Sequence, residues 1–179
     1  MRRRSALLDA LGIAPSLIAA RGLLPFAEAT RLEVVETGSD GREHLLVPEA
    51  AAAWRDLRAA ALADGIELRI VSAFRSVDRQ AKIVRRKLEA GQRVDDVLCV
   101  SAPPGYSEHH TGRAVDVGGP GAPVLEESFA RTAAFAWLQE HAPRFGFVLS
   151  YPVGNRYGYA HEPWHWCWTP ALVGTPESR

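Results

Sequence analysis

Two stretches in the C-terminal half carry histidines and carboxylates at spacings that could hold a metal ion. In the first, His109 and Asp116 stand seven residues apart, at the two ends of a passage from a loop into a short apolar strand. Gly112 lies between them and would allow a tight turn, so both side chains could converge on one ion. Asp116 is flanked by two valines, where a carboxylate is costly to bury unless a cation or hydrogen bonds compensate. A surface loop leading to a solvent-facing aspartate is the alternative, so this stretch alone does not decide for a metal.

The second stretch, residues 161–168, reads literally as HExxH, a pattern that places His161 and His165 on one face of a zinc-binding helix. Pro163 argues against that helix, because proline lacks a backbone donor and moves the preceding Glu162 out of the helical conformation. From residue 164 onward, tryptophans occupy every second position, which is the period of a strand. We therefore predict a strand whose His165 points away from the tryptophans, with Glu162 in an extended turn just before it. A helical zincin is the rejected alternative.

Combined, the two stretches offer His109, Asp116 and His165 as a set of two histidines and one carboxylate. Three protein ligands leave a fourth position for water, which is typical of a catalytic zinc site rather than a structural one. Glu162 could then take a proton from that water. A third stretch runs from a strand into a helix, and Arg75 at the strand end could meet a carboxylate or a developing oxyanion. An isolated arginine at such a position is more often simply solvated.

These three stretches together resemble the D-alanyl-D-alanine carboxypeptidases and dipeptidases of the VanY and VanX kind, which are similar to lysostaphin-type endopeptidases and the hedgehog domain. The metal motif of that group, SxHxxGxAxD, is matched by Ser107, His109, Gly112, Ala114 and Asp116. Its ExWH motif is matched by Glu162, Trp164 and His165. Its SxxRSxxxQ pattern is matched by Ser72, Arg75, Ser76 and Gln80. The three motifs follow in the expected order.

The resemblance implies a zinc metallopeptidase with one zinc ion per chain, held by His109, Asp116 and His165, and with Glu162 as the general base. The implied reaction removes the terminal D-alanine from the stem peptides of peptidoglycan. Water attacks the carbonyl before that D-alanine, and Glu162 passes the proton on to the leaving amine.

The resemblance also implies that Arg75 contacts the substrate or the oxyanion, while Ser107 and Gln80 shape the substrate pocket. The motifs are shared by enzymes that cut other bonds, so several alternatives stay open. These are an L,D-carboxypeptidase, a D-Ala-D-Ala dipeptidase, an L-alanyl-D-glutamate endopeptidase, and a non-catalytic zinc-binding module. Glu162 speaks against the last, because a module without hydrolysis needs no base at that position.

Two further histidines lie next to the motif residues. His110 adjoins His109, and only the motif spacing selects His109 as the ligand. For His161 we expect a contact with the substrate or with a ligand side chain, because a fourth protein ligand would displace the water. The sequence alone does not assign a role to either residue.

Composition limits the classes of protein to which the chain could belong. Its 179 residues, 47% of them apolar, suit a single domain over 1–179, with a motif-bearing core at about residues 66–170. Lysine plus arginine equals aspartate plus glutamate at 21 each, so net charge gives no basis for binding nucleic acid. Cys99 and Cys167 are too few for a disulfide framework, and we expect two buried free thiols. We expect a monomer.

The N-terminus bears on location. Basic residues at positions 2–4 and the short apolar run after them loosely resemble a signal peptide, but Asp9 and Gly12 interrupt the run. No stretch approaches the roughly 20 apolar residues of a transmembrane helix. We expect a cytoplasmic protein, with export to the periplasm or cell wall as the alternative.

Periodicity and breakers predict an α+β fold, in which a mainly antiparallel central sheet is flanked by helices. The expected helices cover residues 5–11, 15–21, 48–64, 76–90 and 126–141. The expected strands cover residues 32–36, 44–47, 66–74, 114–117, 145–151 and 164–168.

Overall fold

A computed structural model describes residues 2–170; Met1 and residues 171–179, which the predicted domain includes, lie outside the described part. Four antiparallel strands form the central sheet in the order β3 (Arg69–Ser72), β4 (Ala114–Gly118), β6 (His165–Trp168) and β5 (Phe147–Leu149). A separate hairpin joins β1 (Glu33–Thr37) to β2 (Glu43–Leu46). The prediction of an α+β fold with an antiparallel sheet is confirmed, whereas the single domain stays a prediction.

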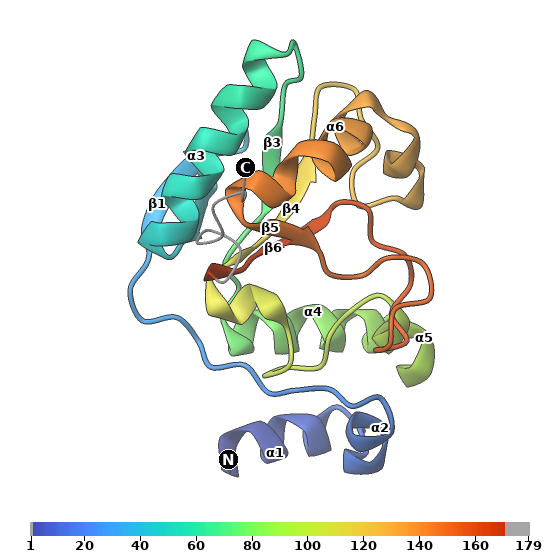
Figure 1. Cartoon of the computed structure of the whole chain (residues 1–179). Helices are drawn as coiled ribbons and strands as arrows, with labels where there is room; N and C mark the ends of the chain where they lie inside the picture. The colour runs from blue at the N-terminus through green and yellow to red at the C-terminus, as the bar shows by residue number, and fades with distance from the viewer. Residues whose placement is uncertain (1, 171–179) are drawn as a thin grey trace.

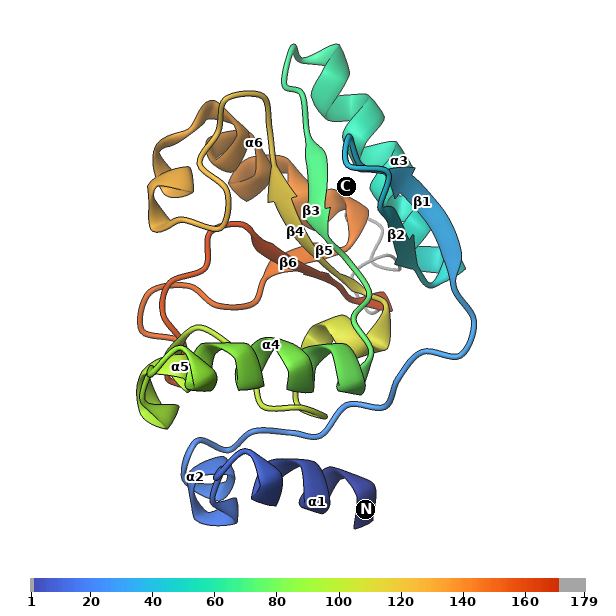
Figure 2. The same ribbon diagram turned by 180° about the vertical axis from the view of Figure 1, so that it is seen from behind.

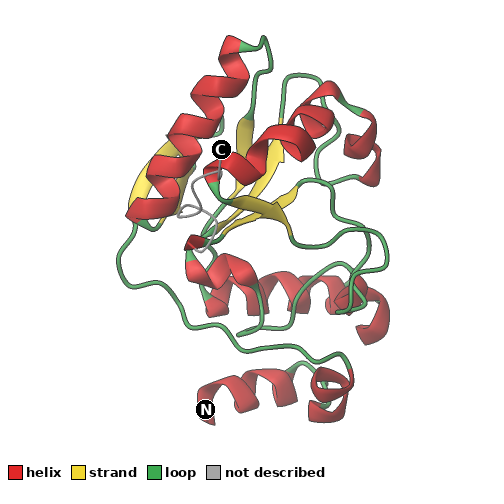
Figure 3. Cartoon of the chain, in the orientation of Figure 1, coloured by secondary structure: helices red, strands yellow, loops and turns green. Residues whose placement is uncertain are grey.

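Helices cover both faces of this sheet (Figures 1 and 3). On one side lie α3 (Pro48–Ala63) and α6 (Ala133–His141), with the β1–β2 hairpin against α3 (Figure 2). On the other side lie α4 (Val77–Glu89) and α5 (Val94–Cys99), and beyond them α1 (Arg2–Ala10) and α2 (Pro15–Ala20). The longest of these helices, α3, has 16 residues, and no described helix combines the length and apolarity needed to cross a membrane.

The central strand β4 is buried along its whole length. Its side chains point alternately toward the main hydrophobic core and toward the opposite face of the sheet, which we call the site face. Val115 and Val117 pack into the main core, which also holds Trp54 of α3 and Trp166 and Trp168 of β6. Because successive side chains of a strand point to opposite faces, Ala114 and Asp116 face the other way. The predicted strand period of residues 164–168 is confirmed, and with it the rejection of a zinc-binding helix.

Helix α4 is held against the N-terminal helices by a second apolar cluster. Its Ala81 and Val84 pack with residues such as Leu8 and Ile18 of α1 and α2. Ser76 is the N-cap of this helix, since its hydroxyl accepts a hydrogen bond from the backbone of Arg79 at 3.1 Å. The helix is thereby fixed with its opposite face turned toward the sheet.

Some local expectations were wrong. The helix expected over residues 126–141 is interrupted at Thr132, because that residue is extended and its hydroxyl caps α6 through the backbone N–H of Phe135. Helix α5 was not predicted at all. Cys99, expected to be buried, is exposed, while Cys167 is partly buried, and both are free thiols.

Gly112 links the two halves of the metal motif and has a left-handed backbone, with φ of 65°. A Cβ there would lie 2.7 Å from the Leu32 side chain and 3.2 Å from the backbone of Val47. We expect Gly112→Ala to lower the free energy of unfolding by about 2–4 kcal/mol, from backbone strain plus overpacking. Gly91→Ala is the control, since its φ is 84° but nothing lies within 4 Å of the added carbon. Equal losses in urea denaturation would contradict the packing argument.

Candidate active site

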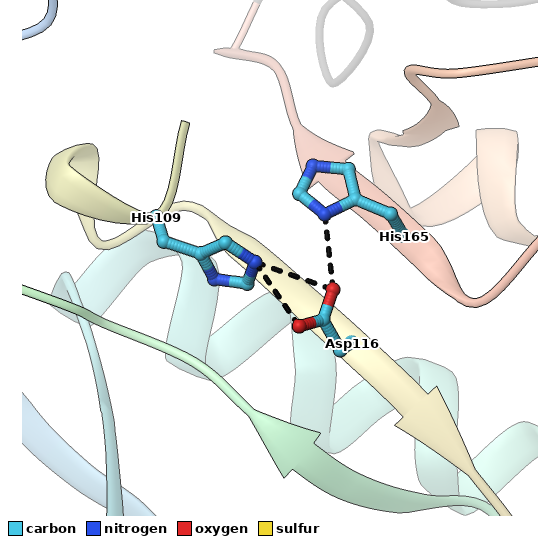
Figure 4. A group of neighbouring side chains, drawn as sticks. All are labelled: His109, Asp116 and His165. Atoms are coloured by element: carbon cyan, nitrogen blue, oxygen red, sulfur yellow. Dashed lines mark hydrogen bonds and ion pairs between the residues drawn. The ribbon is translucent and has the colours of Figure 1, made fainter. Parts of the chain in front are cut away.

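Two histidines and an aspartate from three separate segments meet on the site face of the sheet (Figure 4). The register of β4 and β6 places Asp116 directly opposite His165, although 49 residues separate them in sequence. His109 comes from a single 3₁₀ turn, η1 (Glu108–Thr111), that Gly112 ends just before β4. All three side chains are buried, and one potential ligand atom from each lies within 4.8 Å of the others.

Hydrogen bonds on the outer side of each imidazole set which nitrogen faces Asp116. His109 Nδ1 lies 2.7 Å from the carbonyl oxygen of Ala73, to which it donates, so Nε2 is left 3.2 Å from the Asp116 carboxylate. His165 Nε2 lies 2.9 Å from Glu108 Oε2, and its Nδ1 lies 3.0 Å from Asp116 Oδ1. A metal-binding histidine ordinarily donates its other ring N–H to a carbonyl or carboxylate in this way. The donor set therefore suits a zinc ion.

Protonation in the triad reflects strong coupling between its members. Burial opposes ionisation of Asp116, but His109, His165 and Arg75 together hold its pKa well below the ordinary value. Burial, with the nearby Arg75 charge, lowers the pKa of His109 to about 4. Burial would lower the pKa of His165 as well, yet the hydrogen bonds to Asp116 and Glu108 raise it to about 10. Without a metal, an imidazolium at His165 balances the two carboxylates.

Arg75 joins the triad to the start of α4. Its Nη2 lies 2.8 Å from Asp116 Oδ2, and its Nη1 donates to Gln80 Oε1 at 3.2 Å. Gln80 is itself fixed by donating to the carbonyl of Ala102 at 2.8 Å. The guanidinium, expected to contact the substrate or oxyanion, is thus bound to a triad member, although Arg75 also lines the cleft.

Glu162 lies in the turn before β6, where its backbone pairs with Tyr151 and His165. Its carboxylate feels the charges of His165, Asp116, Arg75 and Lys87 but has no hydrogen-bond partner among the described residues. Burial, reinforced by Asp116, raises the pKa of Glu162 to about 7. A carboxylate with that pKa, free of partners, is suited to move protons near neutral pH.

The triad forms part of the wall of a cleft of about 770 Å³, which is large enough for a short peptide segment. The cleft lies between the site face of the sheet and α4. All seven predicted site residues line it: Arg75, Gln80, Ser107, His109, Asp116, Glu162 and His165. The structure thus brings together in one cavity residues that are spread over 91 positions of the sequence.

Sequence reasoning missed two neighbours of His165. Glu108 bonds to its Nε2 and accepts a hydrogen bond from Ser150 at 2.6 Å. Tyr151 stacks on its ring, with centroids 4.7 Å apart and planes at 28°. Glu108 adjoins the ligand candidate His109 in sequence, so its acidic character was a usable signal. Nothing in the sequence pointed to Tyr151.

The two extra histidines have roles away from the triad. His110 is fully buried, accepts a hydrogen bond from Gly105 N and donates to the carbonyl of Arg75, so it fixes loop backbone. His161 lies 3.5 Å from Glu127, packs against Phe135 and does not line the cleft. The contact of His161 with the substrate or with a ligand side chain therefore stays a prediction.

Comparison with known proteins agrees with this geometry. The family model described as VanY, D-alanyl-D-alanine carboxypeptidase, matches residues 43–171. The chain belongs to this family. The matched region runs from β2 past the end of β6, so it includes every residue lining the cleft except Arg42, and it leaves out α1 and α2.

Individual VanY-family relatives and solved structures show the same likeness. A D-alanyl-D-alanine carboxypeptidase of Enterococcus faecalis is 32% identical over 122 residues, which cover 63% of this chain and 44% of that protein. The LD-carboxypeptidase LdcB, solved to explain peptidoglycan recognition, has a TM-score of 0.72 at 32% identity, covering 84% of this chain and 74% of LdcB. VanYB, solved in complex with D-alanine-D-alanine, has a TM-score of 0.62 at 28% identity, covering 80% and 81%.

The chain is shorter than some of its relatives. It spans 44% of the Enterococcus faecalis carboxypeptidase and 44% of a Bacillus subtilis relative that is 37% identical. Among the solved structures, LdcB and VanYB are matched over 74% and 81% of their chains. The family therefore assigns the fold and the cleft, while activity and substrate are matters for proposal and experiment.

Within this VanY-family site, Glu108 provides a test of how His165 is held. We expect Glu108→Gln to weaken zinc binding by about 10–100-fold, because the lost charge no longer orients the imidazole or raises its basicity. Ser150→Ala removes only the hydroxyl bonded to Glu108 and is expected to have a smaller effect. Competition against a chromogenic chelator measures both dissociation constants. Equal affinity of Glu108→Gln and the unchanged protein would show that Glu108 does not position His165.

Proposed function

We propose that this chain is a zinc-dependent D-alanyl-D-alanine carboxypeptidase that removes the terminal D-alanine from peptidoglycan stem peptides. The observation that carries the proposal is the unpartnered Glu162 carboxylate in the same cleft as the buried triad. A structural metal site needs no free carboxylate beside it, whereas hydrolysis needs a base. Membership of the VanY family supports the choice of reaction.

His109 Nε2, one Asp116 oxygen and His165 Nδ1 are the atoms we assign as zinc ligands. They are buried and mutually close, and each imidazole is already oriented by an outer hydrogen bond. When bound, zinc supplies a Lewis acid and lowers the pKa of the attacking water. A solved VanY from a VanB-type resistance cassette, a glutamate-to-alanine mutant, was obtained with Zn(II).

The other cleft residues then have separate tasks. Glu162 accepts the proton of the attacking water and returns it to the leaving amine of D-alanine. Arg75 holds Asp116 in place and brings a positive charge to the wall where the carbonyl oxygen becomes negative. Gln80 fixes Arg75, and the buried Ser107 faces the cleft beside the triad, where its hydroxyl can contact the peptide.

An L,D-carboxypeptidase is the second candidate, because LdcB, an LD-carboxypeptidase, matches the fold with a TM-score of 0.72. The two activities differ only in the residue that precedes the scissile bond. In a pentapeptide stem that residue is D-alanine, and in a tetrapeptide stem it is an L-centre. Dipeptidase and endopeptidase activities have no separate observation in their favour.

The zinc-loaded protein should be incubated separately with pentapeptide, tetrapeptide and free D-Ala-D-Ala, and the products weighed by mass spectrometry. Release of one alanine from the pentapeptide alone is expected. Release from the tetrapeptide instead would establish the L,D-activity, and cleavage of free dipeptide would indicate a dipeptidase. If no substrate is cut while zinc binds, the chain is a zinc-binding module and the proposal fails.

Compartment decides which of these peptides the protein meets. We propose a cytoplasmic protein acting on soluble precursors or recycled muropeptides, with export to the wall as the alternative. We also propose that it acts as a monomer. Cell fractionation tests the first proposal, and light scattering after gel filtration tests the second.

A further inference from the structure

One face of α4 lines the cleft with basic side chains. Arg79, Lys82, Arg86 and Lys87 all border the cleft, at the spacing of neighbouring turns on one side of a helix. Arg42, from the turn before β2, joins them on the cleft wall. We call these five residues the basic wall.

The basic wall has almost no compensating charge. Within residues 2–170, the only acidic residues lining the cleft are Asp116 and Glu162, which are assigned to the metal and to proton transfer. Among the described residues, Arg79, Lys82, Arg86 and Lys87 form no ion pair with a carboxylate, and Lys87 donates to Ser101 at 2.8 Å. Arg42 reaches only Asp40 of its own turn, at 3.3 Å. The cleft is therefore positive although the whole chain is neutral.

Some arginines elsewhere on the surface do have a carboxylate partner. Arg55 lies 2.8 Å from Glu33, and Arg69 lies 2.6 Å from Glu67. In the cleft, burial and the neighbouring charges of Arg42 and Arg75 lower the pKa of Arg79. Like charges crowded without partners are unfavourable unless an anion arrives, so the arrangement indicates a ligand.

Helix geometry gives the length of that ligand. Arg79 and Arg86 are seven residues apart, which is about 10 Å along a helix and equals roughly three residues of extended peptide. A terminal carboxylate supplies one negative charge, fewer than the basic wall can bind. The remaining charge suits further carboxylates on residues upstream of the scissile bond.

We infer that the basic wall is a subsite for free carboxylates on the stem residues that precede the terminal D-alanines. The inference rests on the proposed function and narrows its substrate class to acidic stem peptides. Stems in which those carboxylates are amidated are poorer substrates. The contact is made to both ground state and transition state, so it acts on KM more than on kcat.

Synthetic pentapeptide stems without sugar or nucleotide provide the test. Two peptides differ only in one group, a free carboxylate or a carboxamide on a residue before the D-alanines. We expect kcat/KM to be about 10-fold higher for the acid peptide, chiefly through KM. The advantage should shrink as salt is raised from about 0.05 to 0.5 M, because partly exposed charges are screened.

Variants of α4 distinguish binding at this subsite from a general effect of the positive charge of the helix. Arg79→Gln with Arg86→Gln should lower the preference for the acid peptide to less than about 3-fold. Arg85→Gln is the matched control, since Arg85 is exposed on the same helix but does not line the cleft. It should keep the full preference. Non-additivity of the two changes, peptide amidation and arginine removal, shows direct coupling.

Each outcome has one meaning. If alanine is released equally fast from both peptides, the carboxylate subsite is wrong while the proposed function stands. A third substrate is the same stem linked to a nucleotide. If only this substrate is cut faster than the two peptides, and the Arg79 and Arg86 variant removes that gain, the basic wall binds a diphosphate and our inference is overturned. If neither peptide is cut by the zinc-loaded protein, the proposed function itself fails.

Discussion

Glu162→Gln is expected to lower kcat for release of D-alanine by about 1000-fold or more while the protein still binds one zinc ion. The amide keeps the shape of the side chain but cannot take a proton from the attacking water or return one to the leaving amine. General base catalysis alone is worth about 100- to 10,000-fold, and here one carboxylate serves both steps. Alanine release, measured with metal content by atomic absorption, checks both halves of the prediction. Glu162→Ala should behave alike.

Glu127→Gln is the matched control, because Glu127 is an exposed glutamate near His161 that does not line the cleft. It should retain the rate of the unchanged protein. Turnover within about 3-fold of normal in Glu162→Gln would remove Glu162 from the mechanism. Loss of zinc together with activity would instead make Glu162 a part of the metal site.

In the metal-free protein, the same variant should also change how the free energy of unfolding depends on pH. The pKa of Glu162 is about 7 in the folded chain against an ordinary 4.5, mainly because of burial. The carboxyl group keeps its proton to a higher pH in the folded state than in the unfolded state. The free energy of unfolding therefore falls as the pH rises from about 4.5 to 7, and it stays lower above about pH 7. After allowance for partial exposure, the cost is about 1–3 kcal/mol. Glu162→Gln should therefore be more stable than the parent at pH 8 and equal to it at pH 4 in urea denaturation.

His109→Ala and His110→Gln are expected to affect different properties although the residues are adjacent: the first lowers zinc affinity, and the second lowers folding stability. His109→Ala removes a ligand, and zinc affinity should fall by more than about 100-fold, beyond what loss of a mere orienting partner causes. His110→Gln should keep one zinc per chain. His110→Gln should instead lower the free energy of unfolding by about 1–3 kcal/mol, because the glutamine cannot satisfy both Gly105 N and the carbonyl of Arg75.

Zinc titration and urea denaturation on both variants check this contrast. The decisive result is the zinc stoichiometry, since the unfolding energies of the two variants can overlap. If His110→Gln lost its zinc and His109→Ala kept it, the metal motif would be in the wrong register. Loss of zinc in both would point to a general distortion of η1 and would leave the ligand undecided.

Several features could be predicted from sequence because they depend on local chemistry. Proline at 163 excludes a helix, and tryptophans at every second position indicate a strand, so the orientation of His165 follows from these residues alone. The helix expected over residues 76–90 is α4, which begins after its N-cap Ser76. The break at Thr132 was missed because a threonine is compatible with both a helix interior and an N-cap, and the choice depends on what surrounds it.

The sequence by itself thus determined the chemistry of this protein: which side chains could bind a metal, which carboxylate could be the base, and which strand would present them. Only the tertiary structure determined which side chains lie next to one another in the site. The pairing of β4 with β6 set Asp116 opposite His165, and η1 carried Glu108 to the far side of that imidazole. The packing of α4 on the N-terminal helices turned its basic side chains into the cleft. Contacts between segments so distant depend on register and helix packing, which no local pattern of residues encodes.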